Sequence, residues 1–239
     1  MHESSFILED INQYLIFISQ VKNLSENTTK SYKRDLKKLS VFFDELKVSN
    51  YSDITPEICS AWIGNLYNQD NNPKSIQRHL SSAKGFFRFL KKNNLIDSSP
   101  FELITAPKSP SNLPEVLSPE DIEQLLNFKP ANLIEIRDMA IIELMYSSGL
   151  RVSETANINL SDFEDDMSFL RVLGKGSKAR LVPVGRFAKN AIKNWLEERK
   201  KITSKTEALF LNSKGSRLSV RSIQIRLQKI AIKQGLPPI

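Results

Sequence analysis

Two cationic segments, each beside a glycine, carry the strongest chemical signal in the sequence. The run 149–154 places Arg151 directly after a Gly-Leu pair, where one helix is expected to end and another to begin. The run 174–180 places Lys175 between two glycines, 24 positions further along the chain. A rigid guanidinium and a flexible ammonium, held separately, are suited to neutralising a phosphodiester during its transfer.

Each segment alone also has a purely structural interpretation. An arginine such as Arg151 often pairs with a nearby acid, here Glu154, and glycine-flanked lysines such as Lys175 are common at hairpin tips. Tyr146 lies on an apolar run and is expected to be a packing residue. Asp165 and its acidic neighbour have no histidine close in the sequence, which disfavours a metal nuclease. Only the two cationic segments together favour phosphate chemistry.

The net charge of +7 is distributed unevenly along the chain. Residues 1–107 hold 13 Lys/Arg and 12 Asp/Glu, residues 108–169 hold 4 and 12, and residues 170–239 hold 17 and 3. A surplus of 14 positive charges in the last segment predicts a polyanionic partner. One alternative is that these charges only form a solvated basic surface without a partner. Binding to a membrane surface is a weaker alternative, because no basic amphipathic helix with an aromatic face stands out.

Composition narrows the class of protein further. Cys59 is the only cysteine, so an internal disulfide is excluded, and its apolar neighbours indicate a packed thiol. The two histidines, His2 and His79, and one cysteine cannot form a zinc cluster, so no metal site is expected. No apolar run reaches the roughly 20 residues of a membrane span, and no secretory signal begins the chain. These features predict a cytoplasmic protein without a membrane partner.

The N-terminal part of the chain is predicted to be a four-helix domain. Apolar residues recur at helical spacing in four segments, and Ser25, Thr55 and Pro73 mark helix starts or breaks. The last of these helices, from residue 74 to about 93, has no acid along its length. A basic helix can lie against phosphates, although a solvated face is an equal alternative. Its candidate DNA-binding residues are Lys74, Arg78, Lys84 and Arg88.

A proline-rich segment divides the chain. Three prolines within residues 107–114 disfavour regular structure, so we predict domains at 1–105 and 116–239 joined by a linker at 106–115. In the second domain, residues 169–173 and 180–184 flank the Gly-Lys-Gly turn and predict a β-hairpin. The remaining segments predict helices, which makes the chain mainly α with a C-terminal α+β domain. The helices are expected to begin at Ser118, to cover 140–150, and to lie at about 187–201 and 219–234.

The residues above form a long pattern that resembles the tyrosine recombinases of the bacterial Xer group. The pattern combines Arg137-Asp138-x-Ala140 and Tyr146–Glu154 with Gly174–Arg180 and Val182-Pro183. Asn27-Thr28-x-x-x-Tyr32-x-x-Asp35-Leu36 is similar to the same family's N-terminal core-binding (SAM-like) domain, and the stretches Ala208–Leu211 and Ile230–Leu236 are similar to its XerC type. The resemblance covers essentially the whole chain.

The resemblance implies a function in site-specific DNA strand exchange. In that family a tyrosine attacks the scissile phosphate, and arginines and histidines stabilise the transition state while a hairpin lysine protonates the leaving 5′-oxygen. By position, Arg151 matches the first catalytic arginine and Lys175 the hairpin lysine. The covalent phosphotyrosyl link conserves the phosphodiester, so no metal or nucleotide cofactor is implied. In the basic C-terminal segment the candidate DNA-binding residues are Lys178, Arg180 and Arg221.

The remaining motifs of the family are not found in these residues. No histidine follows His79 and the last tyrosine is Tyr146, so the His-x-x-Arg motif and the nucleophile are missing. We expect a C-terminally incomplete recombinase that clamps duplex DNA. In complete form it would work in a tetramer with a second Xer-type recombinase, in chromosome dimer resolution and hence chromosome partition at cell division. A non-cleaving DNA-binding paralogue and an unrelated DNA-binding module are the alternatives.

Overall fold

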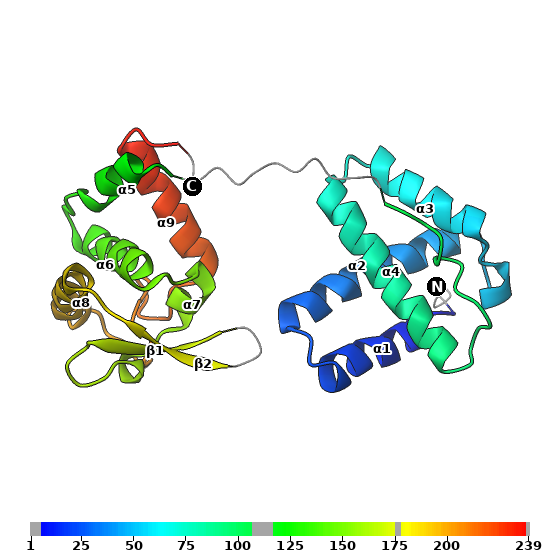
Figure 1. Cartoon of the computed structure of the whole chain (residues 1–239), viewed down its shortest axis with the longest axis horizontal. Coiled ribbons are helices and arrows are strands. Elements are labelled where there is room, and N and C mark those ends of the chain that lie inside the picture. The colour runs from blue at the N-terminus through cyan, green and yellow to red at the C-terminus, as the bar shows by residue number, and fades with distance from the viewer. Residues whose placement is uncertain (1–5, 107–116, 175–177, 238–239) are drawn as a thin grey trace. The chain divides into compact units, whose positions relative to one another are not determined.

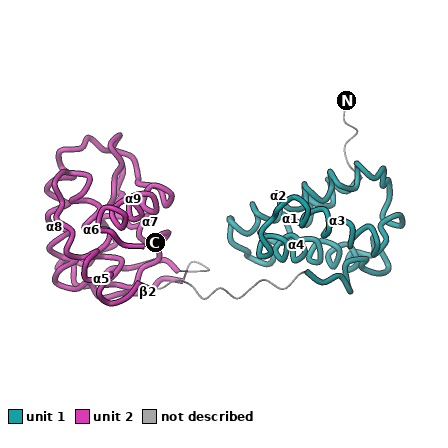
Figure 2. Tube along the Cα trace, turned by 90° about the horizontal axis from the view of Figure 1, so that it is seen from above, with its two compact units in different colours: residues 1–113 teal, residues 114–239 magenta. Residues whose placement is uncertain are grey.

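The computed structural model describes residues 6–106, 117–174 and 178–237 (Figure 1). The chain divides into two compact units, residues 1–113 and residues 114–239, which Figure 2 colours separately. The predicted linker at 106–115 lies, apart from its first residue, outside the described residues, so the predicted domain boundaries stay predictions.

The first unit is built from helices. Their starts follow from side-chain caps: Ser25 accepts a hydrogen bond from the backbone N–H of Thr28, and Thr55 and Asn72 do the same for the two helices that begin with proline. In chain order the elements are α1 (Leu8–Ile16), the π-helical turn η1 (Phe17–Val21), α2 (Glu26–Glu45), the 3₁₀ turn η2 (Tyr51–Asp53), α3 (Pro56–Asn68) and α4 (Pro73–Lys92).

Helix α4 is central to the first unit, because it contacts α1, α2 and α3 (Figure 1). Its apolar stripe includes Phe86 and Phe87, which are fully buried. The T-shaped ring pair of Trp62 and Phe101 adds side chains from α3 and from the segment after α4. Helix α4 is therefore fixed along one side by an aromatic core, and its basic residues must lie on the other sides.

The second unit combines helices with one antiparallel hairpin. Leu170 and Val172 of the first strand are buried and alternate with exposed residues, the pattern of a half-buried strand. The register pairs Phe169 with Pro183 and Leu173 with Ala179. In chain order the elements are α5 (Pro119–Leu126), α6 (Leu133–Ser148), α7 (Val152–Asn157), the 3₁₀ turn η3 (Leu160–Asp162), β1 (Phe169–Leu173), β2 (Ala179–Pro183), α8 (Arg186–Arg199) and α9 (Val220–Lys233).

The core of the second unit lies around helix α6, which packs along α8 and also contacts α7 and α9. Trp195 of α8 is fully buried and donates a hydrogen bond from its indole to the carbonyl of Leu209. Helix α6 ends where Gly149 takes a left-handed conformation, with φ +59° and ψ +37°. This conformation favours glycine, and it turns the chain directly into the segment that carries Arg151.

The structure confirms the predicted fold class: mainly helical, with a four-helix N-terminal part and a C-terminal α+β part that contains a small hairpin. Two elements differ from the prediction. Helix α6 begins at Leu133, earlier than predicted, and the predicted first helix is α1 followed by the π-helical turn η1. In the parts of the chain that are described, no helix is long and apolar enough to cross a membrane.

Candidate active site

Arg151 stands at the start of helix α7, where Gly149 has just ended α6. Its backbone is extended, and its backbone N–H donates a hydrogen bond of 2.8 Å to Oε2 of Glu154. Its side chain is 75% exposed, and within the described part of the chain it contacts Glu154 over 3.2 Å, from Nη1 to Oε1. The predicted helix start is therefore confirmed, and so is the salt link of the structural interpretation. That link leaves most of the guanidinium facing solvent.

The carboxylate of Glu154 is buried and is held chiefly by a different arginine. Arg180 of strand β2 donates from Nη1 to Oε1 over 2.9 Å and from Nη2 to Oε2 over 3.0 Å, a two-pronged ion pair. The hydrogen bond from Arg180, helped by the backbone N–H of Arg151, lowers the pKa of Glu154 to about 2. Glu154 is therefore ionised at neutral pH, and it joins the hairpin to α7.

A polar cavity of about 670 Å³ lies beside this ion pair. Arg151 and Glu154 line one part of it, and Arg171 and Gly174 of the hairpin segment line another. Arg171 pairs at 3.5 Å with Asp162, which also lines the cavity, and its side chain is 63% exposed. Two exposed guanidinium groups at one cavity form a site that can accept a phosphate. Sequence analysis missed Arg171, although its place on the exposed face of β1 follows from strand alternation.

Lys175, the second predicted catalytic residue, lies outside the described residues. The nearest described residues are Gly174 and Lys178: the backbone N–H of Gly174 donates to the carbonyl of Lys178 over 2.9 Å, which continues the hairpin ladder. Gly174 itself lines the cavity of Arg151. The convergence of Lys175 with Arg151 stays a prediction.

The four predicted DNA-binding residues of α4 differ in their contacts. Lys74 and Arg88 are exposed, and Arg88 makes only a 3.4 Å hydrogen bond to a carbonyl of its own helix. Lys84 is half-buried and donates to the carbonyl of Glu102 over 3.1 Å. Arg78 pairs at 2.5 Å with Asp35, which is buried on α2. A direct role in DNA binding is therefore simplest for the two exposed side chains.

The three candidates of the second unit also differ. Lys178 on the hairpin and Arg221 in the first turn of α9 are exposed. Arg180 is committed to Glu154, as described above. Their roles in DNA binding stay predictions.

A buried ion cluster crosses the second unit away from this cavity. Asp138 of α6 is 1% exposed and accepts hydrogen bonds from its neighbour Arg137 and from Arg226 of α9. Arg137 also donates to the carbonyl of Leu211 over 2.9 Å. Because all three side chains bond within the unit, the Arg-Asp pair of the sequence pattern stabilises the packing of α6 on α9.

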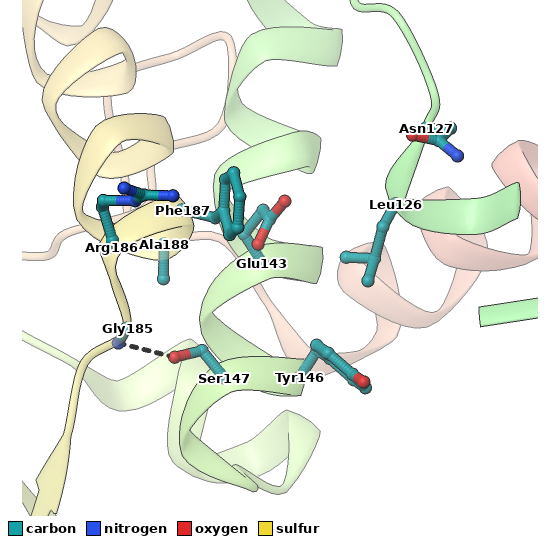
Figure 3. A pocket seen from close by; sticks show the side chains of 9 residues that line it. All are labelled: Leu126, Asn127, Glu143, Tyr146, Ser147, Gly185, Arg186, Phe187 and Ala188. Atoms are coloured by element: carbon teal, nitrogen blue, oxygen red, sulfur yellow. Dashed lines mark hydrogen bonds between the residues drawn. The ribbon is translucent and has the colours of Figure 1, made fainter. Parts of the chain in front are cut away.

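A second cavity, of about 500 Å³, lies between α6 and the start of α8 (Figure 3). There the hydroxyl of Ser147 accepts a hydrogen bond of 2.7 Å from the backbone N–H of Gly185. Tyr146 also lines this cavity and is 61% exposed, so the prediction that it is a packing residue is wrong. Cys59, in contrast, is buried, and burial raises the pKa of its thiol to about 12, as expected for a packed side chain.

Comparisons with known proteins agree with the resemblance noted in the sequence. The profile of the "Phage integrase, N-terminal SAM-like domain" matches residues 11–94, and that of the "Phage integrase family" matches residues 115–238. Tyrosine recombinase XerC of Shewanella amazonensis is 35% identical over 226 residues, which are 95% of this chain and 75% of that protein. Tyrosine recombinase XerC of Haemophilus influenzae (strain Rd) is 35% identical over 230 residues, 96% of this chain and 78% of that protein.

Solved structures share the fold at lower identity. XerH site-specific recombinase bound to its difH substrate, in a pre-cleavage complex, has a TM-score of 0.70 and 19% identity, over 96% of this chain and 70% of that one. A lambda integrase tetramer bound to a Holliday junction has a TM-score of 0.71 and 17% identity, over 96% of this chain and 64% of that one. At these identities the likeness concerns the fold.

Proposed function

The chain belongs to the phage integrase family, as a tyrosine recombinase of the XerC type, and from this premise we propose that it binds duplex DNA and acts in site-specific recombination. The observation that carries the proposal is the exposed guanidinium of Arg151, fixed at its backbone by Glu154 beside a polar cavity. A cation held in this way can stabilise a phosphate without reorganising during the reaction.

The proposed chemistry assigns a step to each cation. A tyrosine oxygen attacks phosphorus, the bond from phosphorus to the 5′-oxygen breaks, and a 3′-phosphotyrosyl link forms. Arg151 neutralises the charge that builds up on the phosphate oxygens, and Lys175 delivers a proton to the departing 5′-oxygen. The free 5′-hydroxyl of another strand then reverses these steps, which releases the tyrosine and rejoins the DNA.

We also propose a biological setting: chromosome dimer resolution, with a second recombinase of the same family as partner. What supports it is the likeness of this chain to two proteins named tyrosine recombinase XerC. Their likeness to this chain, together with the tetramer named in the lambda integrase structure, supports action within a tetramer. We place this function in the cytoplasm, at chromosome partition and cell division.

Charge supports the DNA-binding part of the proposal. Residues 170–239 carry the surplus of 14 positive charges, and the exposed cations Lys178 and Arg221 lie within that segment. In the first unit, Lys74 and Arg88 add exposed positive charge on α4. Such clusters bind phosphates through electrostatic attraction, which releases condensed counterions from the DNA.

A salt titration tests the proposal. The affinity of the chain for a duplex, followed by fluorescence anisotropy, should fall by about 0.9 log units per log unit of salt for each phosphate neutralised. Replacing Lys74 or Arg221 by glutamine should reduce that slope by about 0.9. Lys201→Gln is the matched control, because Lys201 already pairs with Glu198 at 2.6 Å. An affinity that does not change with salt would rule out DNA binding through phosphates.

A further inference from the structure

We propose that Arg180 is a positioning residue: it neutralises Glu154 and thereby keeps the guanidinium of Arg151 free to bind a phosphate. The inference deepens the proposed function and rests on it, because it assigns the phosphate to Arg151. It replaces the expectation that Arg180 itself contacts DNA. Two arginines share one buried carboxylate, and the way they share it supports this role.

The sharing is unequal. Arg180 uses both terminal nitrogens, at 2.9 and 3.0 Å, to bind both oxygens of Glu154. The side chain of Arg151 reaches the same carboxylate through one nitrogen at the longer distance of 3.2 Å. The two side chains also differ in exposure, at 38% for Arg180 and 75% for Arg151. Arg180 is therefore the main counterion of Glu154, and Arg151 keeps most of its donors for another anion.

Removing Arg180 would leave a charge that needs a partner. With both arginines in place, the side chain of Glu154 is 6% exposed. Its carboxylate therefore depends on these arginines for its partners, and a carboxylate at such a site is disfavoured when its main counterion is lost. The remaining guanidinium in contact with it is that of Arg151. We expect Arg151 to turn onto both oxygens, as arginine does with free carboxylates, and to lose the donors that face the cavity.

Arg180 also connects this arrangement to the hairpin end. A Cβ atom placed on Gly174 would lie 3.1 Å from Nη1 of Arg180, so the backbone of Gly174 packs closely on the guanidinium. Gly174 directly precedes Lys175 in the sequence. The ion pair of Arg180 with Glu154 therefore joins helix α7 to strand β2, and Gly174 packs beside it.

A rescue experiment separates this role from direct DNA contact. Arg180→Gln and Arg151→Gln should each weaken duplex binding about tenfold, the loss expected for one charge-assisted hydrogen-bonding group. Adding Glu154→Gln should restore the affinity of the Arg180→Gln variant to within about threefold of the wild type, because the competing charge is gone. If Arg180 contacts phosphate itself, the double variant stays as weak as the single one, and the proposal is overturned.

Two further variants control the measurement. Arg186→Gln removes the same charge from an exposed arginine at the start of α8, so adding Glu154→Gln to it should restore nothing. Where Arg180→Gln fails to fold, as judged by circular dichroism, Arg180→Lys takes its place. Lysine keeps the charge without the two-pronged contact, so Glu154→Gln should then improve binding by the Arg180→Lys variant. No improvement would also overturn the proposal.

Nuclear magnetic resonance distinguishes failure of this inference from failure of the proposed function. If the wild-type chain does not bind duplex DNA at all, the proposed function fails. The Nη1–H signal of Arg151 in the free protein still reports its pairing with Glu154, because Nη1 is the atom in contact with Oε1. That signal should shift in the Arg180→Lys variant and return when Glu154→Gln is added. A signal that is the same in all three proteins would overturn the role of Arg180.

Discussion

On helix α4, the guanidinium of Arg78 lies against a buried carboxylate, which changes what a substitution there would measure. Asp35 is 1% exposed, and burial raises its pKa even though Arg78 pairs with it. The ring of His79 lies beside the same carboxylate, with Nδ1 3.2 Å from Oδ1, and burial lowers the pKa of His79 to about 4. Arg78 is therefore the partner that makes a buried anion tolerable between α2 and α4.

We expect Arg78→Ala to destabilise the first unit by about 3 kcal/mol at pH 7, because it leaves the carboxylate of Asp35 buried and unpaired. The raised pKa of Asp35 fixes the sign of the pH dependence. As the pH falls toward that pKa, the carboxyl binds a proton and the penalty shrinks, so the loss should be smaller at pH 5 than at pH 7. Urea unfolding of both proteins at the two pH values measures this.

The control is Arg88→Ala on the same helix. Arg88 is exposed and bonds only within α4, so its loss should change the unfolding free energy by no more than about 0.5 kcal/mol. Adding Asp35→Asn to Arg78→Ala should recover part of the stability. If Arg78→Ala lowers the unfolding free energy as little as Arg88→Ala does, the ion pair of Arg78 with Asp35 contributes little to stability. A weaker affinity of that variant for DNA could then be assigned to the loss of a direct contact by Arg78.

At the scale of elements, the end of α6 determines where Arg151 lies. Gly149 closes the helix with φ +59°, and the chain reaches the first residue of α7 only three positions later. A side chain in this left-handed conformation is strained, although a Cβ atom on Gly149 would meet no other atom within 4 Å. A substitution at Gly149 should therefore reduce stability through backbone strain alone, because the added side chain has room.

We expect opposite effects from two glycine substitutions. Gly149→Ala should reduce stability by about 1 kcal/mol, because alanine disfavours positive φ. Gly64→Ala should increase it by up to about 1 kcal/mol, because Gly64 is exposed inside α3 and a Cβ atom there would also meet nothing within 4 Å. Urea unfolding measures both. Equal stability of the two variants would contradict the assignment of strain to the left-handed turn.

Local signals in the sequence predicted the starts of these helices. They could not predict ion pairs between residues that are far apart in the sequence. Ser25, Thr55 and Ser118 marked helix starts because capping depends on residues three or four positions apart. Glu154 and Arg180 are 26 positions apart, and only the folded hairpin brings them together. Tyr146 was assigned to the core because α6 is apolar around most of its circumference, so periodicity did not reveal which face is buried.

At the scale of the whole molecule, charge and chemistry are divided between the units. The first unit has nearly balanced charge and exposes lysine and arginine on α4, whereas the basic surplus and the cavity beside Arg151 belong to the second. This division fits a protein in which phosphate chemistry and additional duplex contacts come from different units. The family could be identified from the sequence because its motifs occur in both units, around Tyr32 and Asp35 in the first and around Arg151 in the second.

None of the five tyrosines is among the described residues that line the cavity beside Arg151. Tyr14, Tyr32, Tyr51 and Tyr67 belong to the first unit, and burial raises the pKa of the Tyr14 and Tyr51 phenols. Tyr146 lies in the second unit and is exposed, but it lines cavities other than the one beside Arg151. Attack on phosphorus requires the hydroxyl within about 3–3.5 Å of the phosphate and in line with the leaving oxygen.

We therefore expect these 239 residues to bind a nicked suicide duplex without forming a covalent adduct. The measurement is denaturing electrophoresis of labelled DNA after incubation, with a complete XerC recombinase as the positive control. Tyr146→Phe should bind the duplex as the wild type does, because the phenol has no part in the phosphate site. An adduct that forms with the wild type and disappears in Tyr146→Phe would identify Tyr146 as a nucleophile, and the cavity in Figure 3 would then have to open toward the DNA.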